Sequence, residues 1–171
     1  MAAAVISPGN PNGVTPRLNG QGDPSFRSER GSAETMTLVP EEIQIPIEAD
    51  VHVVAARQAG RTLARQLGFT AGEATIVATA ISELARNIVT HATRGMIIVK
   101  PAENGDRPGV IITARDEGRG IADVRQAMQD GYSTSGGLGI GLPGVKRLMD
   151  DFEIVSEVGR GTSVTVKKWK R

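Results

Sequence analysis

Two kinds of apolar spacing follow one another along the chain and predict its secondary structure. Spacings of three and four residues, typical of one face of a helix, occupy about residues 50–67 and 71–92 and recur from residue 145. Alternating or continuous apolar runs, typical of strands, occupy residues 42–47, 96–100, 110–115, 152–157 and 162–169. The pattern predicts a two-layer α/β sandwich, an α+β fold with helices on one face of a mixed, mostly antiparallel sheet.

The first helix is expected to be capped by Asp50 and to end before Gly68. Its apolar spacing predicts four buried positions: Val54, Leu63, Ala64 and Leu67. In the strand before it, Pro46 lacks a backbone N–H, which favours a position at the sheet edge.

The second helix is predicted to be the longest, because a capping box, Thr70 to Glu73, opens helical spacing over about residues 71–92. Its apolar stripe consists of Ile76, Val77, Ala80, Ile81, Leu84 and Ile88. Glu83 and Asn87 are four residues apart and therefore share one face. His91 continues this column, and we interpret it as a residue of the helix surface.

The later elements are shorter. Residues 104–109 are rich in turn formers and join two strands, so a hairpin is expected there. A short helix is predicted at about 122–130, and a further helix from residue 145 to near Asp151. Its buried face is predicted to include Phe152.

Composition divides the chain in two. Residues 1–38 are rich in Pro, Gly, Ser and Asn and lack a periodic apolar pattern, so we expect a disordered extension. Residues 39–171 are long enough for one domain with its own core.

Net charge and cysteine content limit the classes of partner and site that the chain can have. The net charge of +1 gives no sign of a nucleic-acid or membrane partner, and no apolar stretch approaches the length of a membrane span. The start of the chain lacks the basic region of a signal peptide. There is no cysteine, which excludes disulfides and thiolate metal sites and fits a cytoplasmic location.

Five glycines lie within residues 136–144, directly before a predicted helix. A glycine-rich turn that enters a helix presents free N–H groups and the positive end of the helix dipole to an anion. This indicates a phosphate-binding loop. It lacks the Gly-Lys-Ser/Thr of a Walker loop, and it does not follow a strand as a Rossmann fingerprint does.

Three motifs occur in order on suitable elements. The long helix carries Glu83-Leu-Ala-Arg-Asn87, a strand end carries Asp116-x-Gly118-x-Gly120, and the loop carries Gly137-x-Gly139-x-Gly141. In this order they resemble the N, G1 and G2 boxes of the GHKL ATPase superfamily, whose ATP-binding domain has the Bergerat fold. The resemblance covers about residues 40–171.

The resemblance implies a role for each motif. Glu83 is expected to accept the proton of an attacking hydroxyl and is the candidate catalytic residue. Asn87 offers a neutral oxygen to Mg²⁺. Asp116 is expected to accept from the exocyclic amine of adenine, with Thr162 nearby.

The glycines complete the implied ATP site. Gly118 and Gly120 allow the backbone to approach the base and sugar, and Gly137, Gly139 and Gly141 donate N–H groups to the phosphates.

Within the superfamily, the chain resembles the anti-sigma-factor and switch-kinase branch, above all the RsbT-type kinases, in residues 83–88, 130–139 and 141–150. This implies a serine/threonine kinase of a bacterial stress pathway that phosphorylates a STAS-domain antagonist of the RsbS type. Once released, such a kinase activates an RsbU-type phosphatase. STAS scaffold proteins are further implied partners.

Three alternatives stay open. The domain could hold a nucleotide and regulate a partner by contact alone, although an intact Glu83 favours catalysis. It could be an anti-sigma factor that binds a sigma subunit directly. It could also hydrolyse ATP without a protein substrate.

Overall fold

Five antiparallel strands form one sheet in the order β1-β2-β3-β5-β4. They are β1 (Ile43–Ile47), β2 (Gly95–Asn104), β3 (Arg107–Asp116), β4 (Asp151–Glu157) and β5 (Gly161–Trp169). This computed structural model describes residues 39–129 and 140–171, so the predicted extension (1–38) and residues 130–139 lie outside the described part. Every strand pair described is antiparallel, so the expected mixed sheet is here an antiparallel one.

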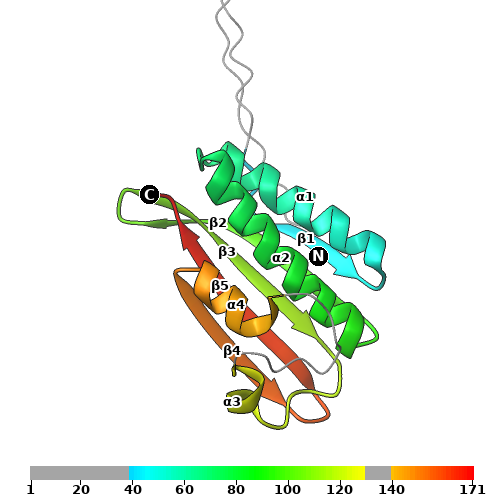
Figure 1. Ribbon diagram of the computed structural model, residues 1–171. Helices are drawn as coiled ribbons and strands as arrows, with labels where there is room; N and C mark the ends of the chain where they lie inside the picture. The colour runs from blue at the N-terminus through cyan, green and yellow to red at the C-terminus, as the bar shows by residue number, and fades with distance from the viewer. Residues whose placement is uncertain (1–38, 130–139) are drawn as a thin grey trace, which may run out of the picture. The chain divides into compact units, whose positions relative to one another are not determined.

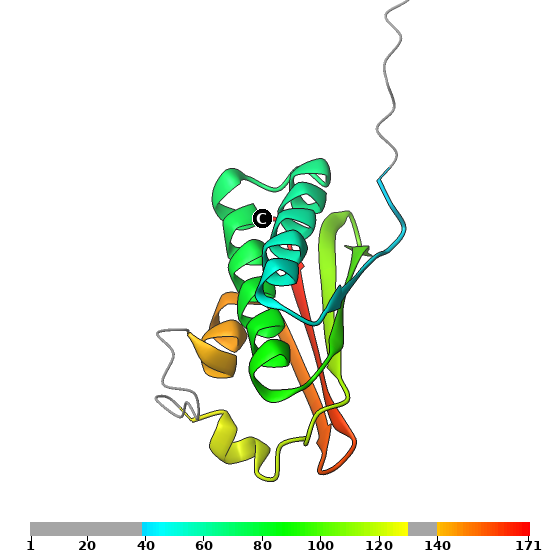
Figure 2. The same ribbon diagram turned by 90° about the vertical axis from the view of Figure 1, so that its right-hand side faces the viewer.

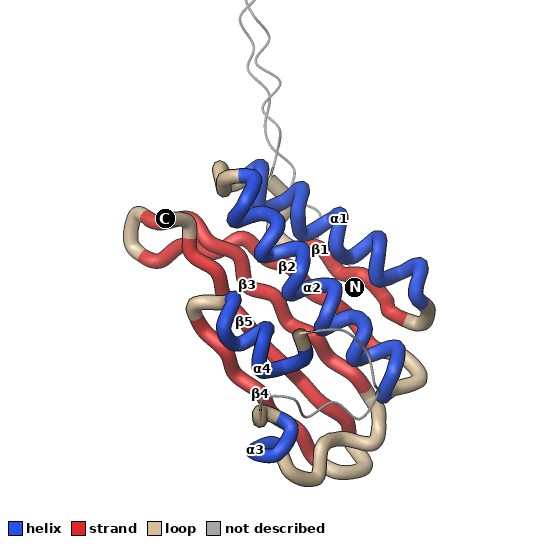
Figure 3. Tube along the Cα trace, viewed as in Figure 1, coloured by secondary structure: helices blue, strands red, loops and turns tan. Residues whose placement is uncertain are grey.

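The helices cover one face of this sheet, as predicted (Figure 1). They are α1 (Asp50–Gln66), α2 (Ala71–His91), the single-turn α3 (Val124–Ala127) and α4 (Gly141–Leu148). Seen from the side, α1, α2 and α4 form one layer and the strands the other (Figure 2). Figure 3 shows the same arrangement with helices blue and strands red.

The core lies between these two layers. In β5, Val164 and Val166 are buried while Thr165 between them is partly exposed, because alternate side chains of a strand point to opposite faces. On α2, Val77, Ile81 and Leu84 are among the buried residues of the same core cluster. The expected edge position of Pro46 is confirmed, since β2 is the single strand that pairs with β1 among the described residues.

The start of α1 differs from the prediction. Its N-cap is Ala49, with no side-chain cap, and Asp50 is the first helical residue. Val53 is 7% exposed and Val54 is 53% exposed, so the prediction that Val54 is buried was wrong. Each residue turns a helix by about 100°, so only one of two neighbouring valines can face the core. The capping box of Thr70 and Glu73 is present as predicted.

The helix α4 begins earlier and ends earlier than expected. It starts at Gly141, inside the glycine run, and stops at Leu148, whereas the pattern predicted a helix to near Asp151. The N–H of Asp150 already donates to the carbonyl of Lys167 on β5. The chain has therefore joined the sheet by this point, and Phe152 packs against the core from β4 instead of from the helix.

No helix of the described segments has the length and apolar character needed to cross a membrane.

Candidate functional site

Glu83 lies in the middle of α2, at the point where the start of α4 meets it. The residue is only 9% exposed. Its Oε2 accepts from the backbone N–H of Gly141 at 3.3 Å, and its Oε1 lies 3.4 Å from Nη1 of Arg86. Gly141 has a φ of +63°, a conformation that favours glycine, and is the first residue of α4. The structure thus brings the N box and the last glycine of the G2 box into direct contact.

Asn87 is one turn further along α2 and partly exposed. Its amide has no hydrogen-bond partner among residues 39–129 and 140–171, so its oxygen is available to a ligand. The same part of the chain holds no group of three or more His, Asp or Glu residues that could bind a metal ion. A cation at Asn87 would therefore take its other ligands from a bound anion and from water.

A second corner of the site forms at the end of β3. Oδ1 of Asp116 accepts from the N–H of Gly118 at 2.8 Å and from the N–H of Thr162 at 3.2 Å. These two bonds fix the carboxylate, and no donor in the described part of the chain reaches Oδ2. The structure thus brings together three predicted residues, and it leaves one carboxylate oxygen free to accept from a ligand.

Packing against neighbouring backbone also accounts for glycine at both glycine positions of the G1 box. A Cβ on Gly118 would lie 2.8 Å from the carbonyl oxygen of His91 at the end of α2. A Cβ on Gly120, where φ is +71°, would lie 2.2 Å from the carbonyl oxygen of Glu157. Close contact with neighbouring backbone therefore explains both glycines, whereas their predicted approach to a ligand stays a prediction. Gly137 and Gly139 lie outside the described residues.

Ser156 on β4 is a member of this corner that the sequence analysis did not single out. Its Oγ accepts from the N–H of Ile121 at 2.8 Å and lies 2.8 Å from Oγ1 of Thr162. It also donates to the carbonyl of Gly161 at 3.2 Å. A signal was present, because Ser156 occupies an inward position of a strand whose other inward residues, Phe152 and Ile154, are apolar.

His91 was interpreted as a surface residue, but it is half-buried at the end of α2. Burial lowers the pKa of its imidazole, the charge of Arg119 lowers it further, and the carboxylate of Asp116 opposes both effects. The end of α2 thus lies close to the Asp116 corner. Glu83 is eight residues earlier, about 12 Å along the helix axis at 1.5 Å per residue. The site therefore has two corners, joined by α2 with Asn87 between them.

Comparisons with known proteins show the family to which the chain belongs. The family model for the histidine kinase-like ATPase domain matches residues 45–168. The serine/threonine-protein kinase RsbT of Bacillus subtilis (strain 168) is 49% identical over 127 residues, which cover 74% of this chain and 96% of that protein. The anti-sigma F factor of Heyndrickxia coagulans is 38% identical, with 60% of this chain and 74% of that protein covered.

A solved structure shares the fold. The crystal structure of the RsbU and RsbW domains of Rv1364c from Mycobacterium tuberculosis superimposes with a TM-score of 0.53 and 21% sequence identity. The match covers 77% of this chain and 33% of that longer chain.

Proposed function

Since the chain belongs to the family of histidine kinase-like ATPase domains, the GHKL superfamily that its motifs indicated, we propose that it phosphorylates a STAS-domain antagonist in a bacterial partner-switching pathway. The reaction class is that of a protein serine/threonine kinase, given 49% identity across almost all of a kinase of this class. The pathway would operate in the cytoplasm, where ATP is available.

The contact between Glu83 and Gly141 carries the proposal. A kinase of this type needs a proton acceptor beside the place where the phosphates bind. The start of α4 offers N–H groups and the positive end of a helix dipole, and Glu83 lies against it. Arg86 lies beside the other carboxylate oxygen, at 3.4 Å.

The Asp116 corner supports ATP as the nucleotide. Its free oxygen can accept from an amine, and adenine carries an exocyclic amine where guanine carries a carbonyl oxygen. Two backbone N–H groups hold the carboxylate in place, so it is oriented before a ligand arrives. We propose that Thr162 and Gly118 border the adenine there.

Asn87 fits a magnesium ion that is held mainly by phosphates. Its unpaired amide oxygen is a suitable hard ligand, and the lack of an acidic cluster around it matches an ion that keeps its waters. When bound, MgATP supplies the phosphoryl group, and the ion neutralises part of its charge. The chain's own residues then position the acceptor hydroxyl and receive its proton at Glu83.

Similarity to RsbT supports the remaining steps of the proposed partner-switching pathway. We propose that the antagonist holds the kinase until it is phosphorylated, and that the released kinase activates an RsbU-type phosphatase. STAS scaffold proteins would assemble with the antagonist.

A direct anti-sigma factor is the second candidate, because several relatives carry that name at 32–38% identity. Pull-down of a sigma subunit by the purified protein, competed by a STAS-domain protein, would favour this alternative. Failure to retain any sigma subunit, with the STAS protein retained, would favour the switch kinase.

The decisive experiment combines the purified protein, γ-labelled ATP, Mg²⁺ and the STAS-domain protein encoded nearest to it. We expect label on a serine or threonine of the STAS protein. Glu83→Ala should abolish the label. Glu83→Gln should do the same although its amide oxygen can still accept from Gly141, because it cannot take up the proton.

Each other result has a definite meaning. ATP binding without labelling of any STAS protein would favour the regulator that acts by contact alone. Phosphate release without protein labelling would favour an ATPase. Undiminished labelling by Glu83→Gln would remove Glu83 from the role of base while leaving the kinase assignment intact.

A further inference from the structure

A lysine occupies a core position at the end of β5. Lys168 lies on the helix-facing side of the strand, two residues after Val166, and its side chain is only 6% exposed. A buried ammonium is costly unless its hydrogen bonds are made and its charge is paired. Its partners therefore indicate why the charge is there.

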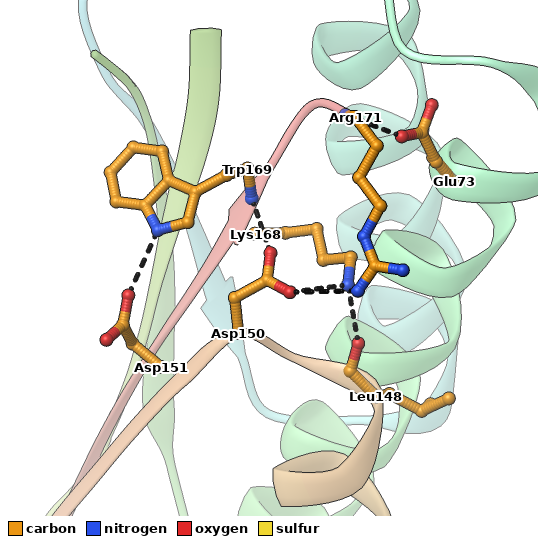
Figure 4. Close-up of polar contacts among 7 residues, drawn as sticks. All are labelled: Glu73, Leu148, Asp150, Asp151, Lys168, Trp169 and Arg171. Carbon is orange, nitrogen blue, oxygen red and sulfur yellow. Dashed lines mark hydrogen bonds and ion pairs between the residues drawn. The ribbon is translucent and has the colours of Figure 1, made fainter. Parts of the chain in front are cut away.

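The first partner of Lys168 is the end of α4. Its Nζ donates to the carbonyl of Leu148, the last helical residue, at 3.1 Å (Figure 4). The last carbonyls of a helix have no partner within the helix and carry partial negative charge, so a cation there stabilises the helix end. Lys168 thus caps α4 from the neighbouring strand.

The second partner is Asp150, in the link between α4 and β4. Its Oδ1 lies 3.0 Å from Nζ of Lys168, and its Oδ2 accepts from the N–H of Trp169 at 2.8 Å (Figure 4). Burial alone would raise the pKa of this carboxyl, but the Trp169 N–H, Lys168 and Arg171 together hold it below its ordinary value. Asp150 is therefore charged at neutral pH and pairs with the buried ammonium.

We infer that Lys168 is a positioning residue for the phosphate-binding end of α4. The helix has eight residues, about 12 Å at 1.5 Å per residue, and a helix this short is not stable by itself. Its first N–H meets Glu83 and its last carbonyl meets Lys168. Fixing the far end sets where the helix lies along its own axis, and with it where the N–H of Gly141 points.

This inference rests on the proposed function, and it makes a selective prediction. Loss of the lysine should weaken the binding of phosphates at the start of α4 and leave the Asp116 corner unchanged. Binding of ATP should then fall while binding of adenosine, which lacks phosphates, stays the same. A general loss of stability would weaken both ligands together.

The test measures the affinity of the full chain for MgATP by calorimetry and for adenosine by NMR titration. For Lys168→Met we expect MgATP affinity to fall about tenfold, as for one lost charge-assisted hydrogen bond, with adenosine affinity within about twofold. Lys167→Met is the matched control, because it removes the same charge from the opposite face of the same strand. It should bind both ligands as the unsubstituted protein does.

Unchanged MgATP affinity of Lys168→Met, or an equal loss of affinity for MgATP and adenosine, would overturn this inference and leave the proposed function in place. If circular dichroism shows that Lys168→Met does not fold, the affinities for MgATP and adenosine are measured on Asp150→Asn instead. This variant removes the charge paired with Lys168 and keeps an oxygen to accept from the Trp169 N–H. Absence of MgATP binding by the unsubstituted protein would instead overturn the proposed function, and this inference with it.

Discussion

The carboxylate of Glu83 and the ammonium of Lys168 lie at opposite ends of the same short helix, α4. Glu83 accepts from its first N–H and Lys168 donates to its last carbonyl. Each charge is opposite in sign to the partial charge of the helix end it meets, which typically contributes about 0.3–1 kcal/mol and up to about 2 kcal/mol when partly buried. The proposed catalytic base is therefore also part of what holds α4 in place.

Substitution of Glu83 should consequently affect stability as well as activity. Glu83→Ala removes the acceptor for Gly141, and we expect it to lower the free energy of unfolding by about 1–2 kcal/mol. Glu83→Gln keeps a neutral acceptor and should cost less than half as much. Urea denaturation of the two variants measures the difference, and equal stabilities would show that the contact does not support α4.

Asp116→Asn should weaken ATP binding by about tenfold or more. The substitution replaces a charged acceptor with an amide, and a hydrogen bond to a charged group contributes about 1.5–3 kcal/mol. Calorimetry with ATP and with GTP measures the change, and we expect discrimination between them to shrink. Asp123→Asn, at the N-cap of α3, is the control and should leave both affinities unchanged. Unaltered discrimination in Asp116→Asn would place base recognition elsewhere.

Gly120→Ala should destabilise the protein by more than about 2 kcal/mol. A positive φ costs a non-glycine residue about 1–2 kcal/mol, and the added methyl would also meet the backbone oxygen of Glu157 at 2.2 Å. Gly159→Ala is a matched control, because φ there is +81° and nothing lies within 4 Å of the added Cβ. Chemical denaturation should show the smaller loss for Gly159→Ala; equal losses would mean that only φ matters.

We predict that the protein loses stability in acid as Glu73 is protonated. The backbone N–H of Arg171 and the groups of Thr70 lower its pKa from 4.5 to about 2. The folded state therefore favours the charged form, so this contribution is present above about pH 4.5 and is lost as the pH falls toward 2. Denaturation between pH 6 and pH 2 should show a shallower decline for Glu73→Gln. Thr70→Ala removes the hydroxyl donor and keeps the backbone N–H, so it should give an intermediate slope.

We predict a second decline in stability, nearer to neutral pH, that depends on His91. Burial and Arg119 lower its pKa below 6.5, so the unfolded chain takes up the proton more readily. This contribution to stability is present above pH 6.5 and is lost as the pH falls below it. We expect His91→Gln to flatten the stability profile between pH 7 and pH 5. Arg119→Gln should reduce the decline without abolishing it, and an unchanged profile in both variants would contradict the assignment.

The sequence predicted best what depends on local residues. Thr70 and Glu73 specify the start of α2 within four residues, and Pro46 marks the edge strand, because these signals act through the backbone nearby. Glu83, Asp116 and Gly141 are candidate site residues because their motifs stand in a recognisable order, and their roles stay predictions. The structure adds which of them touch.

What the sequence did not predict depends on contacts between distant segments. Val53 and Val54 are alike in sequence, and only the packing of α1 decides which one is buried. The end of α4 is set by the bond from Asp150 to Lys167, which belongs to another strand. Lys168 looks like an ordinary solvated lysine near the end of the chain, and its burial becomes visible only when α4 lies against β5.

The pairing of β3 with β5 has a consequence for how this domain tolerates change. Asp116 ends one of these strands and Thr162 lies near the start of the other, and a direct hydrogen bond joins them. The chain between them, which includes α3, α4 and β4, leaves the sheet beside Asp116 and ends beside the same residue, and doubling the length of a flexible loop within it costs only about 0.6 kcal/mol. Changes in the length of the loops of this segment should therefore leave in place the hydrogen bond between Asp116 and Thr162, and with it the corner proposed to recognise the base.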